Sequence, residues 1–229
     1  MILLAGLTAC GQKNAMDPVG SDAVAGNEVS AGEETLSEEA PEIIEIPFDM
    51  ADMMDQVAAS EVELSYTEYL PDEGFANAEL YGIEDGKAYV FLNCQKFVVF
   101  KDKAYAMSGS AGEAILHYTE TEDGAKLDEV EWSADGSDHD QWILENFPED
   151  ILAQWEVYDA YDENGFLKLG TKMLYKAEEA LGVEVERENL LEIDPESGKY
   201  QIIKTSESGS TEDDTYEFTS EVIEEGTLD

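Results

Sequence analysis

Residues 76–93 read ANAELYGIEDGKAYVFLN, a stretch that is typical of a β-hairpin. Asp85-Gly86 lies at its centre, and an Asp-Gly pair favours the two-residue turn in which both residues take positive φ angles. β-branched and aromatic residues gather on either side of this pair. We therefore predict strands over Ala76–Ile83 and Lys87–Asn93, paired antiparallel.

More strands are predicted after the hairpin. Their expected ranges are Lys96–Phe100, Ala104–Met107, Ala114–Thr119 and Ala125–Trp132, with turns at Lys101–Lys103 and Asp123–Gly124. The small residues of Ser108–Gly112 predict a flexible break between two of them. Together these runs indicate an antiparallel β meander.

A helical pattern precedes the strands. In Asp49–Ala58, the apolar side chains of Met50, Met53, Met54 and Val57 recur at i, i+3, i+4 and i+7. This spacing puts them on one face of a helix, where core packing explains them better than a methionine-rich binding groove.

Helical signals return after the strands. Asp138 followed by Gln141 has the form of a capping box. Pro148 is predicted to occupy the first position of a second helical segment. Phe166–Leu181 is the clearest helix of the chain, and Gly182 after it is a typical C-cap.

The C-terminal segment returns to strand character. Tyr200–Thr205 and Thr215–Ile223 could pair as a hairpin, with Ser206–Ser210 as part of the connecting loop. This order, a helix followed by a run of strands and then by further helices, predicts the α+β class. We expect an N-terminal helix, an antiparallel curved β meander as in cystatin-like and NTF2-like folds, then C-terminal helices and a candidate extra hairpin. Such a sheet often has a concave face that holds a ligand.

Leu7-Thr8-Ala9-Cys10 matches a lipobox, the cleavage and acylation signal of bacterial lipoproteins. No Lys or Arg precedes it, whereas a secretory signal has a positive n-region, so we expect the true start to lie upstream of residues 1–10. The alternative is a disordered terminus with a chance cysteine. Residues 11–42 are acidic and poor in large apolar side chains, which predicts a disordered tether. Residues 43–229 then form the α+β domain, with 183–229 as a candidate appendage.

Acidic residues dominate the charge of the chain, at 55 against 12 basic residues and a formal net charge of −43. Phosphates repel such a chain, which excludes nucleic acid as a partner. Anionic lipid headgroups repel it as well, so membrane attachment has to come from a lipid on Cys10. Solubility explains most of this charge, and the field would also attract cations and basic partners.

The chain has two cysteines, Cys10 and Cys94. If Cys10 is lipidated, Cys94 has no intrachain disulfide partner. Cys94 lies in an apolar strand-like run, so we interpret it as a buried small hydrophobic residue and not as a nucleophile. The sequence has no apolar run of about 18 residues that would span a bilayer.

Motifs for catalysis are weak. His117 and His139 lack an HExxH context, and Gly109-Ser110-Ala111-Gly112 does not fit the nucleophile elbow. Asp135, Asp138 and Asp140 are weak candidates for a metal site, because their spacing is not that of an EF-hand and a capping role explains Asp138. We predict no catalytic residue, no bound metal and no cofactor.

Several motifs of the middle region resemble a known family. They are Tyr69-Leu70-Pro71, Glu73-Gly74-Phe75-Ala76, Asp85-Gly86-Lys87, Tyr89-Val90, Ser108-Gly109-Ser110, Glu129-Val130-Glu131-Trp132, Asp135-Gly136-Ser137 and Phe147-Pro148-Glu149. Over Glu68–Asp150 the chain is similar to an uncharacterised extracytoplasmic domain of Firmicutes. That domain occurs in lipoproteins and attached to BlaR1-type membrane peptidases. The resemblance implies a location on a Gram-positive cell surface and a sensing or regulatory role, and it carries no catalytic residues.

Three functions therefore remain open. The first is a non-enzymatic surface protein, lipid-anchored on the outer face of the bacterial cytoplasmic membrane, that binds a small ligand or a partner. The second is a cell-envelope hydrolase that uses paired carboxylates. The third is an accessory protein whose C-terminal strands dock on another envelope protein.

Overall fold

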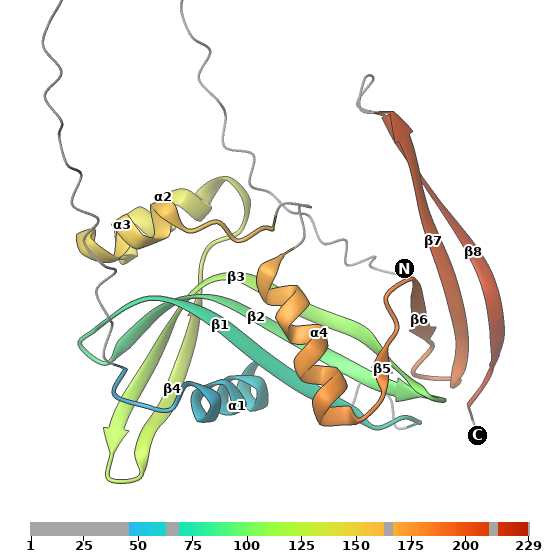
Figure 1. Cartoon of the computed structure of the whole chain (residues 1–229), viewed down its shortest axis with the longest axis horizontal. Helices are drawn as coiled ribbons and strands as arrows, with labels where there is room; N and C mark the ends of the chain where they lie inside the picture. The colour runs from blue at the N-terminus through green and yellow to red at the C-terminus, as the bar shows by residue number, and fades with distance from the viewer. Residues whose placement is uncertain (1–45, 63–68, 163–166, 211–214, 229) are drawn as a thin grey trace, which may run out of the picture. The chain divides into compact units, whose positions relative to one another are not determined.

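A four-stranded antiparallel meander forms the centre of the structure, a computed structural model that describes residues 46–62, 69–162, 167–210 and 215–228. Its strands β1 (Asp72–Glu84), β2 (Lys87–Phe100), β3 (Lys103–Thr121) and β4 (Gly124–Trp132) pair in chain order. Figure 1 shows the sheet curving, with α1 on one side and α4 on the other. The predicted α+β class is confirmed. Cys10 and the predicted tether over residues 11–42 lie outside the described residues.

The predicted first hairpin is confirmed. Glu84 pairs with Lys87 across the turn, and Asp85 and Gly86 have φ angles of 48° and 75°. Both angles are positive, as the predicted two-residue turn requires. Local turn chemistry therefore sets the register of β1 and β2.

The strands are longer than predicted, and the predicted break at Ser108–Gly112 is wrong. β3 runs through this segment, which stays paired with β2 from Ser108 opposite Lys96 to Gly112 opposite Leu92. Met107 is an extra residue between two successive pairs, which makes a β-bulge. Small residues do not interrupt the strand because the pairing is made by backbone groups, for which β2 supplies the partners.

One side of the sheet, which we call the α1 face, packs on helix α1 (Met50–Glu61). The predicted apolar stripe is confirmed, since Met53, Met54 and Val57 are buried and Met50 packs beside them. Asp49 caps this helix by accepting a hydrogen bond of 2.7 Å from the backbone N–H of Ala51.

The opposite side, which we call the α4 face, carries three helices: α2 (His139–Asn146), α3 (Glu149–Val157) and α4 (Lys168–Leu181). Aromatic side chains of the sheet, among them Tyr81 and Phe91, pack under α2 and α3. Met173 and Ala177 of α4 pack on Phe75 of β1 and on neighbouring residues of β2 and β3.

Two of the predicted helix boundaries are wrong, and one is confirmed. The Asp138 side chain makes no capping bond, because a short 3-10 helix (Gly136–Asp138) leads directly into α2. Pro148 is the N-cap of α3, one position earlier than predicted. Gly182 ends α4 in the left-handed conformation at φ 69°, as predicted. Phe166, the predicted first residue of this helix, lies outside the described residues.

The C-terminal segment adds strands to two sheets. β5 (Glu184–Val185) pairs parallel with β3 at Lys103 and Ala104. A second antiparallel sheet contains β6 (Asn189–Ile193), β7 (Lys199–Ser210) and β8 (Thr215–Thr227). The predicted loop at Ser206–Ser210 is wrong, because these residues continue β7 and pair with β8.

The second sheet shares a hydrophobic cluster with the meander. Val98, Phe100 and Tyr105 of β2 and β3 pack with Leu191, Ile193 and Ile202. Side chains alternate along β2, so Val98 and Phe100 point to the same side as Cys94, which belongs to the α1 cluster. On the α1 face, helix α1 therefore covers one part of β2 and the second sheet covers another part of this strand.

Candidate functional site

The two histidines have different surroundings. Nε2 of His117 on β3 lies 2.9 Å from Oε2 of Glu131 on β4, in a partly exposed cross-strand pair. His139 begins α2, with Nε2 2.7 Å from Oε2 of Glu113 and Nδ1 3.0 Å from Oδ1 of Asp140. A carboxylate at each ring nitrogen favours the imidazolium form, in which both nitrogens donate.

The pKa of His139 reflects these neighbours. Burial lowers it, but the hydrogen bonds to Asp140 and Glu113 raise it by more, so the pKa lies above its usual value. The ring carries positive charge over a wider pH range than a free histidine. His139 thus supplies the counter-charge for a carboxylate on the sheet.

Glu113 is a buried acid on β3 that holds the helices of the α4 face. It is 8% exposed, and its Oε1 accepts a 2.9 Å bond from Nε1 of Trp155 on α3. With His139 on its other oxygen, Glu113 connects the sheet to α2 and α3. A buried charge persists only with such partners. Sequence reasoning missed Glu113 because nothing local distinguishes it among 55 acidic residues.

Tyrosines surround this acid. Burial, and secondarily the charge of Glu113, raise the pKa of Tyr81 above its usual value. Burial, with Glu79 and Glu113, raises the pKa of Tyr158 to about 12. The hydroxyl of Tyr81 is buried with no hydrogen-bond partner in the described part of the chain. Both tyrosines are therefore neutral at physiological pH and serve the packing under α3.

The structure does not bring the three weak metal candidates together. Asp135 and Asp138 are exposed, and Asp138 accepts a 3.2 Å bond from the hydroxyl of Ser137. Asp140 is engaged with His139. Over residues 46–62, 69–162, 167–210 and 215–228, no group of three or more His, Cys, Asp or Glu side chains is placed to hold a metal ion.

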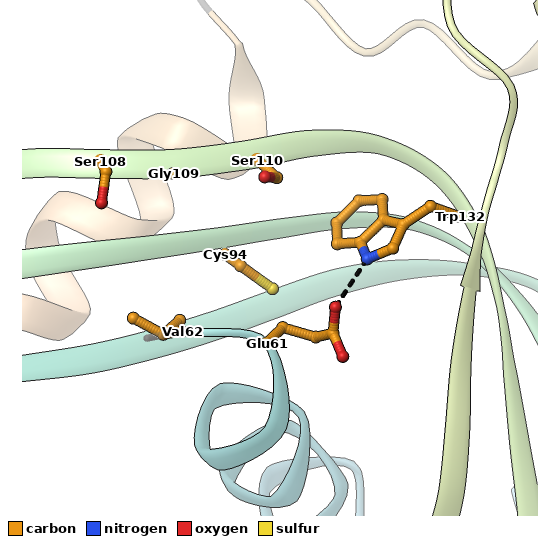
Figure 2. Close-up of a pocket in the computed structure, with 7 residues that line it drawn as sticks. All are labelled: Glu61, Val62, Cys94, Ser108, Gly109, Ser110 and Trp132. Carbon is orange, nitrogen blue, oxygen red and sulfur yellow. Dashed lines mark hydrogen bonds between the residues drawn. The ribbon is translucent and has the colours of Figure 1, made fainter. Parts of the chain in front are cut away.

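A cavity of about 170 Å³ opens on the α1 face of the sheet. Figure 2 shows its walls: Glu61 and Val62 at the end of α1, Cys94 of β2, Ser108–Ser110 of β3 and Trp132 of β4. Nε1 of Trp132 donates a 2.8 Å bond to Oε2 of Glu61, and the Ser60 hydroxyl donates one of 2.8 Å to Oε1. These bonds hold a carboxylate at the wall of the cavity.

Cys94 forms part of the floor of this cavity. The prediction that it is buried is confirmed at 3% exposure. Burial, and secondarily the charge of Glu61, raise the pKa of its thiol to about 12. The thiol is therefore protonated at neutral pH and acts as apolar surface, since only the thiolate is a strong nucleophile.

β3 has an open edge beside the cavity. β4 pairs with β3 from Ala114 onward, and β5 pairs with it at Lys103 and Ala104. Between these partners, Tyr105–Gly112 pairs with β2 on one side and with no described strand on the other. We call this run the open edge. Ser108, Ser110 and Ala111 are exposed there.

Flanking hydrogen bonds show which backbone groups of the open edge point outward. The carbonyl of Glu113 accepts a 2.9 Å bond from the N–H of Ser133, and that of Ala104 accepts one of 2.8 Å from Glu186. Backbone groups alternate along a strand, so those of Gly109 and Ala111 point to the same side as those of Glu113. The open edge therefore presents N–H and C=O groups of the kind that a further strand would pair with.

A shallow surface groove lies at the end of α4. Its residues include Tyr175, Glu178 and Arg187. The guanidinium of Arg187 lies 2.9 Å from Oε1 of Glu178 and 5.2 Å from the ring centre of Tyr175. Glu178 also accepts a hydrogen bond from the backbone of Val185, which lowers its pKa together with Arg187. The Arg187–Glu178 ion pair and the hydrogen bond from Val185 to Glu178 hold β5 against α4. The charged residues of the groove therefore have a structural role.

Among the described residues, no helix is long and apolar enough to cross a membrane. No protein-family model, no curated protein and no solved structure matches this chain.

Proposed function

We propose that this chain is a non-enzymatic, lipid-anchored bacterial surface protein that binds an extended polypeptide along the open edge of β3. The observation that carries this proposal is an uncharged run of strand, Tyr105–Gly112, whose outer side no described strand pairs with and which is exposed over residues 108–111. An extended peptide that pairs with such an edge gains main-chain hydrogen bonds, and pockets beside the edge select its side chains. The cavity at Ser108–Ser110 is such a pocket.

The composition of the open edge supports this role. Edge strands in soluble proteins normally carry charged residues that discourage further pairing. The outermost strands β1, β4, β6 and β8 follow this rule with acidic residues such as Glu73, Glu129, Glu192 and Glu221. The open edge reads YAMSGSAG and has no charged residue. Its small side chains also leave room for a second backbone.

The proposed location depends on Cys10 and on the resemblance to Firmicutes extracytoplasmic domains. A lipid on Cys10 would tether the domain through residues 11–42 at the outer face of the cytoplasmic membrane. Mass spectrometry of the mature N-terminus, from a precursor expressed with a functional secretory signal, tests this part. A diacylglyceryl cysteine is expected, and an unmodified Cys10 would contradict the location without affecting the binding proposal.

The binding proposal is tested with a proline on the open edge. In the full chain, Ala111→Pro removes an outward N–H and puts a ring where a partner backbone would lie. Ala111→Thr is the matched control, because it changes the side chain and keeps the N–H. The probes are short capped peptides in which Val and Thr alternate around one varied central residue, and their binding is measured by fluorescence polarisation.

We expect some of these peptides to bind the unmodified protein and the threonine variant, and to bind the proline variant about tenfold more weakly or worse. A second measurement does not depend on how the proline variant folds: methylation of alternate peptide nitrogens should abolish binding to the unmodified protein. The proposal is wrong if no peptide binds, or if neither the proline nor the methyl groups weaken binding.

A further inference from the structure

The cavity beside the open edge has a negatively charged wall. Each carboxylate oxygen of Glu61 accepts one hydrogen bond from a neutral donor, Trp132 on one side and Ser60 on the other. No described cationic side chain forms an ion pair with Glu61. A carboxylate has about four acceptor positions, so this group can still accept hydrogen bonds from a molecule that enters the cavity.

The buried cation among the described residues of the sheet is already engaged. Lys96 lies two residues from Cys94 on β2 and points to the same face. Its Nζ is 3.9 Å from Oδ2 of Asp72, and the side chains are 4% and 10% exposed. The positive charge of Lys96 is therefore directed toward Asp72 of β1, on the side of β2 away from the open edge.

The size and lining of the cavity suit one side chain. Pockets for small organic ligands usually measure about 300–1,000 Å³, well above the roughly 170 Å³ of this cavity. Val62, the protonated thiol of Cys94 and the indole of Trp132 provide apolar surface, and Glu61 provides one charge (Figure 2). An alkyl chain that ends in a cation matches this combination.

We propose that the cavity receives a lysine side chain from the extended polypeptide that pairs with the open edge, with the lysine ammonium at Glu61. This inference rests on the proposed function above. The lysine stem lies along Val62, Cys94 and the indole of Trp132, whose face attracts cations. Lysine fits better than arginine, because its ammonium is a compact charge on a flexible unbranched stem and the cavity is small.

The geometry of strand addition brings such a side chain to the cavity. Adjacent strands lie about 4.8 Å apart, and side chains directly opposite each other on paired strands are neighbours. Ser108 and Ser110 point to the α1 face, as do their partners Lys96 and Cys94 on β2. A residue of the added strand opposite Ser108 or Ser110 would therefore point to the face that holds Glu61.

The charge of the whole chain supports this partner over a second copy of the same protein. Because each chain has a formal net charge of −43, two copies repel each other, whereas the chain attracts a basic segment of another protein. The open edge itself is uncharged, so pairing brings no fixed charge against the partner backbone. Charge complementarity thus favours a lysine-containing segment of a basic protein.

The test compares full-length protein with Glu61→Gln and the matched control Glu129→Gln. Both substitutions remove one negative charge, but Glu61 is the last residue of α1 at the cavity, whereas Glu129 lies on β4 opposite His117, outside the cavity. The probes are capped peptides of alternating Val and Thr whose central residue is lysine, norleucine, Nε-acetyl-lysine or arginine. Affinities are measured by fluorescence polarisation at low salt, and folding is checked by thermal unfolding.

We expect the lysine peptide to bind best and to lose about tenfold or more in affinity with Glu61→Gln. The norleucine peptide should bind the unmodified protein and Glu61→Gln alike, and Glu129→Gln should change lysine binding by less than about twofold. Acetylation of the lysine should weaken binding to the unmodified protein by a similar factor, which tests the charge without any substitution in the protein.

Other results separate the two proposals. If peptides bind the open edge but lysine, norleucine and acetyl-lysine bind equally, the lysine inference is wrong and the proposed function stands. A preference for arginine, or equal losses with Glu61→Gln and Glu129→Gln, also overturns the inference. If no peptide binds, both proposals are wrong. A concentration-dependent dimer that Ala111→Pro abolishes would assign the open edge to a second copy and overturn the lysine inference.

Discussion

Gly109 and Gly112 occupy the same strand but have different room for a side chain. A Cβ at Gly109 would lie 2.5 Å from the backbone oxygen of Cys94, whereas a Cβ at Gly112 would meet nothing closer than Oγ of Ser133 at 3.9 Å. Neither glycine has a positive φ angle. The difference between the two sites is therefore steric, and it arises where β3 passes close to β2 beside the bulge.

We predict that Gly109→Ala lowers the free energy of unfolding by about 1–3 kcal/mol, the usual cost of forcing extra atoms into a packed site. Gly112→Ala is the matched control and should be neutral or stabilising by up to about 1 kcal/mol, because alanine restricts the unfolded chain. Urea unfolding of both variants measures the difference. Equal stabilities would mean that β3 has more room at Gly109 than the structure shows.

At the scale of elements, α2 and α3 are attached to the sheet through His139, Glu113 and Trp155. The pKa of His139 is raised in the folded protein by its two carboxylate partners, against the lowering effect of burial. A group with a raised pKa stabilises the fold below its unfolded value, near pH 6.5, and this contribution is lost as pH rises through the folded value.

We therefore predict that the stability advantage of the unmodified protein over His139→Gln is largest near pH 6 and declines by about pH 9. Its size at the lower pH should be on the order of 1 kcal/mol, since the His139 side chain is 29% exposed and solvent screens part of the interaction. Urea unfolding at both pH values measures it. A difference that grows with pH would show that neutral His139 is the stabilising form.

The elements also show which parts of the fold the sequence could predict. Asp85-Gly86 sets its own turn, and the stripe on α1 is a periodic signal, so both were predicted from a few neighbouring residues. The continuity of β3 through Ser108–Gly112 was not predicted, because it depends on the residues of β2 that pair with this segment. The side-chain cap predicted for α2 at Asp138 is not formed, because a 3-10 helix precedes α2 at the place of the expected cap.

The candidate sites were harder to predict than the strands. Glu113 meets His139 and Trp155, which lie 26 and 42 residues away in sequence. Glu61 meets Trp132 from 71 residues away. Such contacts exist only once the sheet has formed, and in a chain with 55 acids no local pattern distinguishes Glu61 and Glu113 from the others. The sequence did predict that Cys94 is buried.

At the scale of the whole molecule, the net charge of −43 acts on folding and on binding in opposite directions. Folding brings like charges together, and this repulsion destabilises the compact state. Binding of a basic segment brings unlike charges together, and this attraction favours association. Dissolved salt screens both, since the Debye length falls from about 30 Å at 0.01 M to about 8 Å at 0.15 M.

We predict that raising NaCl from about 10 mM to about 150 mM stabilises the protein and weakens binding of the lysine peptide. A reduction in repulsion on the order of 1 kcal/mol would raise Tm by about 2–4 °C for a chain of this size. Potassium chloride serves as the control, because screening at these concentrations depends on ionic strength and not on the cation. If salt lowered Tm, attractive ion pairs such as Lys103–Glu186 would outweigh the repulsion. If peptide affinity did not change with salt while Tm rose, the peptide would be held by its backbone and apolar contacts, and the charge of Glu61 would have no part in its recognition.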